Sequence, residues 1–290
     1  MTTLNVGKSL NDQDALWRYM SLDKFIDLVE SQSLFFVPLS WYEKTDPFEG
    51  YVPQVAFQAL ADISKKYRDQ HLAQLDKLEG ASTLSMPPPI KQRLRHDLLK
   101  LREKVESQVP TMGALAKNIA DCTVVNCWYR STHESEGMWN LYARNGVAIR
   151  TSVGALRAAL EDGEEVPVVH LGAVKYLDFA DTNLTASDCV TVDGQMIGMI
   201  KRVAYEHEKE VRMYIAPTRP EDSVELYKPE AKRVSLNVHS LIESVVISPF
   251  ASATIDRSAR AVCRWSGVDE SFVSRSKLLD RCTHLLDVFS

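Results

Sequence analysis

The hydrophobic pattern at the start of the chain predicts a strand, a helix and a second strand. Residues 21–30 begin with a serine that can cap a helix, and their apolar positions recur at helical spacing. Those apolar positions are Leu22, Phe25, Leu28 and Val29. Two short apolar and aromatic runs, 16–20 and 34–37, flank the helix and have the length and composition of strands.

Residues 55–118 differ in pattern from the rest and predict a helical insertion. Long polar stretches are punctuated by leucine, and a run of three prolines at 87–89 breaks them. Residues 90–109 then carry apolar side chains at helical steps. We therefore expect one core domain, formed by residues 1–54 and 119–290, that carries the insertion 55–118.

After residue 121 the pattern returns to short strands separated by helices. The predicted strands cover residues 123–129, 146–151, 166–171, 173–179, 210–215, 234–238 and 242–248. The predicted helices cover residues 134–144, 153–160, 193–205 and 252–265. Because the order is irregular, it predicts an α+β fold with a mixed or antiparallel sheet core, flanking helices and the helical insertion.

Composition narrows the class of protein. Of 290 residues, 45% are apolar and 25% are charged, which is typical of a soluble globular chain, and the net charge of -5 disfavours general attraction to nucleic acid. We expect a cytoplasmic protein without a membrane segment, since no apolar run is long enough to span a bilayer and the start lacks a signal sequence. The five cysteines form no CxxC pair, so we expect reduced core thiols and no metal site.

The second half of the insertion offers a partner surface. Residues 90–106 have an excess of three positive charges over negative ones. Such a helix face is either solvated or in contact with a macromolecule, and we retain both interpretations.

Two polar clusters lie within strand-like, aromatic surroundings. In the first, Arg18 stands between Trp17 and Tyr19, where its planar guanidinium can bind a phosphate or a ribose or can stack on a neighbouring ring. The second cluster begins in the predicted strand 123–129 and ends at residue 152. Its aromatic side chains, Trp128, Trp139 and Tyr142, either form a wall for a planar base or pack in a core. Its last two residues, Thr151 and Ser152, are polar.

The third cluster surrounds the start of the predicted strand 210–215. Alternation along a strand places Glu208, Glu210 and Arg212 on one face, and the apolar residues between them on the other. One interpretation is an exposed strand edge with a salt bridge. The other is a carboxylate that orients a ribose hydroxyl or stabilises an oxocarbenium-like centre while Arg212 holds its orientation.

Taken in order, these motifs resemble the domain-of-unknown-function 2971 family, a bacterial group often linked with phage defence. The resemblance covers most of the chain outside the insertion. It rests on residues 16–19, 34–36, 46–50, 127–128, 134–135, 138–139, 141–142, 146–149, 174–176, 201 and 208–212.

A looser resemblance, to ADP-ribosyltransferase folds, implies a mechanism. Such folds present an Arg or His on a first strand, a strand with Ser or Thr, and a late strand with a catalytic Glu. Arg18, then Thr151 with Ser152, then Glu210 follow that order. The resemblance implies that Arg18 contacts the NAD phosphates or ribose, that Thr151 or Ser152 supports the site, and that Glu210 engages the nicotinamide ribose.

The leading hypothesis is therefore an enzyme that cleaves the nicotinamide–ribose bond of NAD and passes ADP-ribose to a macromolecule or water, as a phage-defence or toxin effector. One alternative is a sensor that binds a nucleotide or nucleic acid without turnover. Another is a metal-dependent nuclease effector with Asp46, Glu49, Glu208 and Glu210 around a divalent ion.

Overall fold

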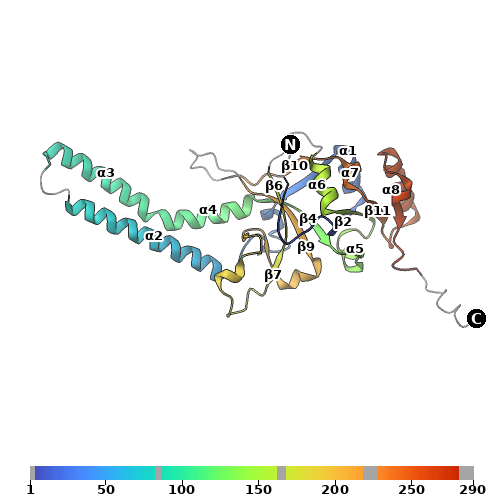
Figure 1. The fold of residues 1–290 in the computed structure, drawn as a ribbon, viewed down its shortest axis with the longest axis horizontal. Coiled ribbons are helices and arrows are strands. Elements are labelled where there is room, and N and C mark those ends of the chain that lie inside the picture. The colour runs from blue at the N-terminus through green and yellow to red at the C-terminus, as the bar shows by residue number, and fades with distance from the viewer. Residues whose placement is uncertain (1–3, 82–85, 162–167, 218–226, 281–290) are drawn as a thin grey trace, which may run out of the picture.

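The core of the protein is a large mixed sheet. A computed structural model describes residues 4–81, 86–161, 168–217 and 227–280 (Figure 1). The large sheet contains β1 (Leu4–Val6), β2 (Ala15–Ser21), β3 (Ser33–Pro38), β4 (Val124–Arg130), β5 (Gly146–Ser152), β6 (Val169–Ala173), β9 (Glu210–Ile215), β10 (Lys232–Ser235), β11 (Ser244–Ile247) and β12 (Val273–Arg275). A separate pair consists of β7 (Lys175–Leu177) and β8 (Ile200–Arg202).

Helices flank the sheet and extend away from it. The α-helices are α1 (Leu22–Ser31), α2 (Gln54–Ala81), α3 (Pro88–Glu106), α4 (Gln108–Cys122), α5 (Glu136–Tyr142), α6 (Val153–Glu161), α7 (Val238–Leu241) and α8 (Ala253–Trp265). Short 3₁₀ turns are η1 (Leu39–Tyr42), η2 (Ala186–Cys189), η3 (Val203–Glu208) and η4 (Glu270–Phe272). The predicted α+β class, with a mixed sheet and flanking helices, is confirmed.

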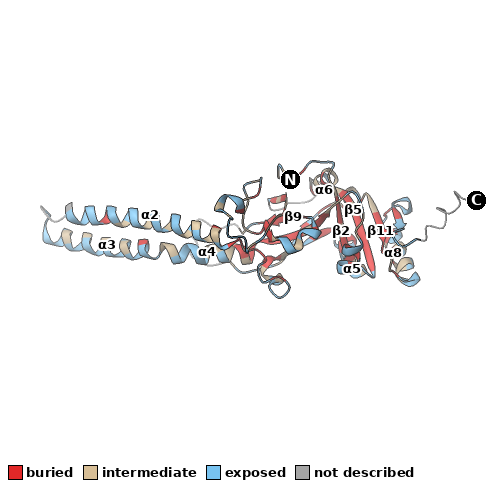
Figure 2. Cartoon of the chain, turned by 90° about the horizontal axis from the view of Figure 1, so that it is seen from below, coloured by how far each residue is buried: buried red, intermediate tan, exposed pale blue. Residues whose placement is uncertain are grey.

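The two faces of the sheet bury different kinds of side chain. Leu16 and Met20 of β2 point into the main apolar core, to which α1, α6 and α8 contribute (Figure 2). Trp17 and Tyr19 alternate with them and pack under α5 in a smaller aromatic cluster. Strand alternation therefore places a mainly aliphatic set of side chains, with Phe36 and Trp128 among them, on one face of the sheet and a smaller aromatic cluster on the other.

The sheet divides at β4. Along one edge β4 pairs continuously with β9, from Val124 to Tyr129. Along the other edge its first two residues pair with β3 and its last two pair with β2. Among the residues that the structure describes, none pairs as a strand with residues 126–128 on that edge, and we call this opening between β2 and β3 the fork.

The predicted insertion is a helical arm formed by α2, α3 and α4. Figure 1 shows α2 running away from the core and α3 and α4 returning beside it. At its root, Val52 and Ala56 pack against Cys189 and Ile200. In the part of the chain that the structure describes, no helix combines the length and hydropathy needed to cross a membrane.

The predicted helix 193–205 is wrong. This segment is a loop followed by β8 and η3. Gly194 and Gly198 adopt φ angles of 77° and 73°, which interrupt a helix and favour glycine. The Asp193 carboxylate accepts hydrogen bonds from the backbone and hydroxyl of Ser9 instead of facing solvent on a helix.

Other predicted elements differ mainly at their ends. The predicted strand 173–179 is interrupted and contributes only β7 to the sheet pair. The predicted strand 166–171 is β6 from Val169 onward, and residues 166 and 167 lie outside the described part of the chain. The helix predicted over 90–109 ends at Glu106, and α4 begins at Gln108.

Candidate functional site

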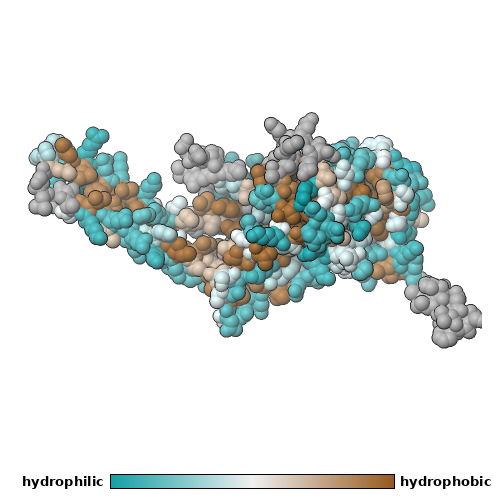
Figure 3. Space-filling view, in the orientation of Figure 1, coloured by the Kyte–Doolittle hydropathy of each residue, from teal (hydrophilic) through white to brown (hydrophobic). Residues whose placement is uncertain are grey.

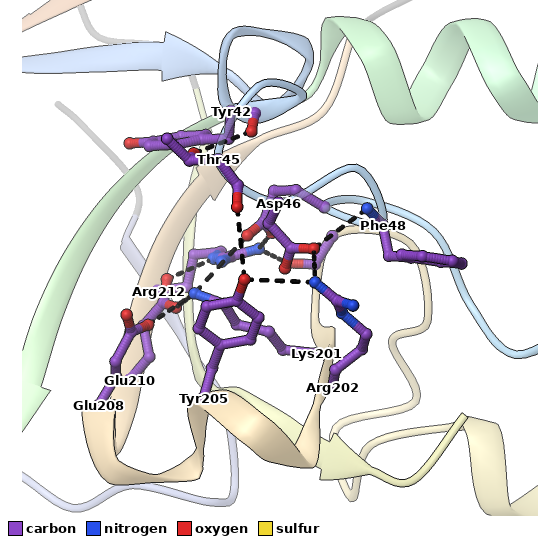
Figure 4. Close-up of polar contacts among 12 residues, drawn as sticks. Tyr42, Thr45, Asp46, Phe48, Lys201, Arg202, Tyr205, Glu208, Glu210 and Arg212 are labelled. Atoms are coloured by element: carbon purple, nitrogen blue, oxygen red, sulfur yellow. Dashed lines mark hydrogen bonds and ion pairs between the residues drawn. The ribbon is translucent and has the colours of Figure 1, made fainter. Parts of the chain in front are cut away.

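Lys201 lies at the centre of a buried group of carboxylates. Its Nζ is 2.6 Å from Glu208 Oε2, 3.1 Å from Glu210 Oε2 and 3.6 Å from Glu49 Oε2 (Figure 4). These side chains come from the turn before α2, from β8, and from the junction of η3 with β9. Lys201 is therefore bound by two carboxylates from the segment that follows it, Glu208 and Glu210, and by one that is distant in sequence, Glu49.

Arg212 is the second cation that binds these carboxylates. Its Nε is 2.7 Å from Glu210 Oε1, one terminal nitrogen is 2.9 Å from Glu49 Oε1, and the same nitrogen donates to the carbonyl of Gly198. Only 1% of Arg212 is exposed. Buried guanidinium groups need such partners, because an unpaired charge in a protein interior is strongly unfavourable.

We call Glu49, Lys201, Glu208, Glu210 and Arg212 the ion-pair network. Its three carboxylates exceed its two cations, so it has a net charge of -1 when all are ionised. Burial by itself raises the pKa of Glu210, but the charges of Arg212 and Lys201 overcome this and lower that pKa to about 2. Burial lowers the pKa of Lys201, and the neighbouring Glu210 and Glu49 more than reverse this. Glu210 therefore stays ionised.

Aromatic hydroxyls and a thiol border the ion-pair network. Tyr142 donates to Glu208 Oε1 over 2.7 Å, and the Tyr176 hydroxyl accepts from the backbone N–H of Glu210 over 2.8 Å. Burial, followed by the charge of Glu210, raises the pKa of the Cys127 thiol. Burial also raises the pKa of Tyr142, so both groups stay neutral at physiological pH.

A second ion pair borders the network on the side of the turn that precedes α2. Arg202 lies 2.6 Å from Asp46 Oδ1 and donates to the Tyr205 hydroxyl over 3.2 Å. Its guanidinium also lies over the ring of Phe48, at 4.8 Å from the ring centre. Figure 4 shows Arg202 and Asp46 beside Tyr205, across from Glu208 and Glu210.

The fork places a second cation near this network. Arg18 donates to the side-chain oxygen of Asn126 and to the carbonyl of Cys127, so it fills the unpaired edge of β4. Asn126 in turn donates to the carbonyl of Phe35 on β3 over 2.9 Å. Arg18 therefore ties β2, β4 and β3 together where the sheet divides.

Two donors at the fork lack their usual partners. Arg18 forms no ion pair with any carboxylate in the described residues, and its guanidinium lies over the ring of Trp128 at 5.6 Å. Burial lowers the pKa of Arg18, as expected where no carboxylate compensates the lost hydration. The indole nitrogen of Trp128 is buried and has no hydrogen-bond partner in the described part of the chain. An anionic ligand in the cavity would supply the counter-charge that Arg18 lacks.

The fork joins both sets of residues in one cavity of about 590 Å³. Alternation places Arg18, Asn126 and Trp128 on the face of the main core, and Glu210 and Arg212 on the opposite face. Because β2 and β3 diverge, residues from both faces line the same cavity. The cavity thus has a positive end at Arg18 and a net negative end at the ion-pair network.

Seven of the ten residues predicted for the site line this cavity. They are Arg18, Tyr19, Trp128, Tyr142, Glu208, Glu210 and Arg212. As predicted, Glu210 and Arg212 lie on the same face of β9. Glu208 also contacts the network, but it lies in η3 and not on that strand. The alternative of an exposed strand edge is wrong, since β9 is paired on both sides and Glu210 is only 5% exposed.

The other three predicted residues lie elsewhere. Trp139 is fully buried, packs against Tyr19 and donates to Glu134, so it supports the wall of the cavity from behind. Thr151 is fully buried opposite Leu16, on the core side of the sheet. Ser152 caps α6 and donates to Glu243. The order of Thr151 and Ser152 in the sequence carried no information about which way they point.

Lys201 and Asn126 are the principal site residues that sequence reasoning missed. Lys201 was assigned to a helix, and the signal against that helix was the pair Gly194 and Gly198 within five residues. Asn126 stands in a strongly apolar strand, and a buried amide in such a strand signals a specific hydrogen-bonding role.

The nuclease alternative predicted a metal among Asp46, Glu49, Glu208 and Glu210. Each of these carboxylates is engaged by Lys201, Arg202 or Arg212. Across the described ranges, no group of three or more His, Cys, Asp or Glu side chains is arranged to hold a metal ion.

Comparisons of the chain with protein-family models, with curated proteins and with solved structures found no match in any of the three. The function must therefore be argued from the cavity itself.

Proposed function

We propose that this protein is an ADP-ribosyltransferase-like enzyme that binds NAD in the cavity at the fork and breaks its nicotinamide–ribose bond. The observation that carries the proposal is Arg18, a cation without a carboxylate partner that shares one cavity with the carboxylates Glu208 and Glu210. NAD has the complementary charge pattern, with an anionic diphosphate at its centre and a cationic nicotinamide–ribose at one end.

In this proposal Arg18, whose guanidinium lies over the ring of Trp128, contacts the diphosphate. Tyr19 and Tyr142 supply aromatic surface for a planar base. Glu210 is held ionised by Arg212 and Lys201, so its charge is available to a ribose that becomes positive as the bond breaks.

The reaction is a substitution at the ribose carbon that carries nicotinamide. The carbon–nitrogen bond breaks and its electron pair leaves with nicotinamide, which becomes neutral. An acceptor oxygen, from water or a macromolecule, forms the new bond and releases its proton to solvent. Glu208, whose two oxygens already contact Tyr142 and Lys201, helps to hold the negative end of the cavity.

The resemblance to the domain-of-unknown-function 2971 family extends the proposal to a phage-defence or toxin effector that acts on the cytoplasmic NAD pool. A macromolecular acceptor would approach the cavity from outside the sheet. The basic helix predicted over 90–106, which is α3 in the fold, offers such an acceptor a positively charged contact surface.

Nicotinamide release from NAD, followed by chromatography, tests the proposal. We expect release by the wild-type protein and a loss of at least about a hundredfold in the Glu210→Gln variant, since one electrostatic contact of this kind contributes that much. Glu30→Gln, an exposed glutamate on α1, is the matched control and should keep full activity. Absence of both nicotinamide release and label transfer by folded wild-type protein would refute the enzyme.

A sensor that binds a nucleotide without turnover is the second candidate, favoured by one observation. Both oxygens of Glu210 are already paired, with Arg212 and Lys201. Calorimetric titration with NAD and ADP-ribose separates the two functions. Binding that is weakened by Arg18→Gln but accompanied by no nicotinamide release would favour the sensor.

A further inference from the structure

The helical arm carries large apolar side chains that nothing in the described chain covers. On α2 they are Leu60, Ile63, Tyr67 and Leu78, on α3 they are Ile90, Leu99 and Leu101, and on α4 there is Met112. Between 40% and 58% of each side chain is exposed. Single exposed leucines are ordinary on protein surfaces, but a contiguous group of this kind marks an interaction site.

Apart from Leu99 and Met112, these side chains lie on one side of the arm. Leu60, Ile63 and Tyr67 follow each other at steps of three and four, so they form one stripe along α2. On each helix the exposed apolar positions are offset from the residues that face the other helix, such as Leu75 and Val105. The exposed side chains are rotated in the same sense about each helix axis, away from the face that meets the other helix. Because α2 and α3 are antiparallel, this rotation places both sets on the same side of the arm. Figure 3 shows hydrophobic residues gathered there, along the face of the arm turned to the viewer.

We call this surface the arm groove, defined by Leu60, Ile63, Tyr67, Leu78, Ile90 and Leu101. Both of its edges are basic. Lys66 follows Ile63 by three residues, Arg93 follows Ile90 by three, and Lys104 follows Leu101 by three. Lys77 and Lys100 extend the two edges.

The basic side chains of the edges are available to a partner. None of Lys66, Arg93 and Lys104 forms an ion pair within the part of the chain that the structure describes. The acidic residues of the hairpin lie mainly on other sides. Asp76 and Glu79 pair with Arg102, and Asp97 is the acidic residue within the basic edge of α3.

We propose that the arm groove docks an amphipathic helix of a partner protein, with the partner's apolar stripe in the groove and acidic side chains along its flanks. An exposed apolar surface shared by two adjacent helices accepts a third helix through contacts at i, i+3, i+4 and i+7. The positive charge of both edges favours an acidic partner over a second copy of this chain, because a second copy would bring basic edges against basic edges.

The probe is a synthetic helical peptide of about 18 residues, which covers the roughly 27 Å from Leu60 to Leu78. It carries leucine at i, i+3, i+4 and i+7 and glutamate on both flanks. A matched peptide carries lysine in place of glutamate. With the full-length protein, fluorescence anisotropy should give at least about tenfold tighter binding for the glutamate peptide, and that difference should shrink as salt is raised.

Variants locate the site. Ile63→Ser with Leu101→Ser should weaken binding of the glutamate peptide by at least about tenfold, the effect of removing apolar anchors from an interface. Arg93→Glu with Lys104→Glu should reverse the preference between the two peptides. The matched control is Leu99→Ser, which removes an equally exposed leucine from the opposite side of α3 and should leave binding unchanged.

Several outcomes would overturn this assignment. Equal affinity for the two peptides, or no binding of either, removes the acidic helix as the occupant. Concentration-dependent dimers in sedimentation that disappear in the Ile63→Ser, Leu101→Ser variant would assign the groove to a second copy. Tighter binding to vesicles of mixed phosphatidylcholine and phosphatidylserine, or to single-stranded RNA, that is lost in the same variant would assign it to those partners.

Discussion

The ion-pair network and the helical arm are both rich in charge, yet the charges are placed in opposite ways. In the network, Arg212 and Glu210 are 1% and 5% exposed and lie 2.7 Å apart. On the arm, Arg102 pairs with Asp76, and the two side chains are 31% and 63% exposed. The same pair of chemical groups therefore experiences two different dielectric surroundings.

This difference determines what each region can do. Exposed pairs are screened by water and salt, so the arm can exchange its internal pairs for contacts with a partner at little cost. Buried pairs are held because every alternative leaves a charge without water or a counter-ion. The network is therefore suited to hold a carboxylate ionised at a fixed place, and the arm is suited to docking.

The largest loss of stability is expected when the buried cation Arg212 is removed. Arg212→Met should destabilise the protein by about 3–5 kcal/mol, because Glu210 and Glu49 lose one of the two cations that they share and keep only Lys201. Urea denaturation followed by circular dichroism measures the loss. Adding Glu49→Gln should recover part of it, and a single-variant loss under about 1 kcal/mol would contradict the assigned burial.

Acid should reduce the stability contribution of the network more than that of the arm. Glu210 has a pKa of about 2 in the folded protein, against 4.5 for an ordinary glutamate. A lowered pKa contributes stability that is present above pH 4.5 and disappears as the pH falls toward 2, about 3 kcal/mol in all. Urea midpoints measured across this window should fall steeply for the wild type and less steeply for Glu210→Gln. Equal slopes would show that Glu210 is not held by Arg212 and Lys201.

A substitution at the fork should reduce the stability of the protein by an intermediate amount. Asn126→Leu removes the acceptor of Arg18 and the donor to Phe35, and a buried group left without its hydrogen bond costs about 1–3 kcal/mol. Asn140→Leu makes the same change at an exposed position of α5 and is the control. Thermal unfolding compares the two, and similar melting temperatures would contradict a structural role for Asn126.

Removing an ion pair of the arm should have the smallest effect on the stability of the protein. Arg102→Ala breaks its pairs with Asp76 and Glu79, yet the urea midpoint should stay within experimental error because these groups are exposed. The measurement should be repeated at low salt, where any contribution is largest. A loss comparable to that of Arg212→Met would remove the distinction between the two regions.

Local pattern predicted much of the fold because it records which side of an element is buried. The alternation in residues 210–215 predicted that Val211 faces the core while Glu210 and Arg212 face the other side. Helical spacing similarly located α1, α3 and α8 within a few residues. The pattern was misleading at 193–205, where tertiary contacts and two glycines produce a loop and a short strand.

The sequence by itself determined the α+β class, the position of the helical insertion, and the residues of β9 that face away from the core. Only the tertiary structure decided which of the polar clusters meet. Arg18 lies on the opposite face of the sheet from Glu210, and nothing local shows that β2 and β3 share one edge of β4 and then diverge. That divergence opens the sheet and places both charges in one cavity, because strand pairing is a long-range property that no short stretch of sequence records.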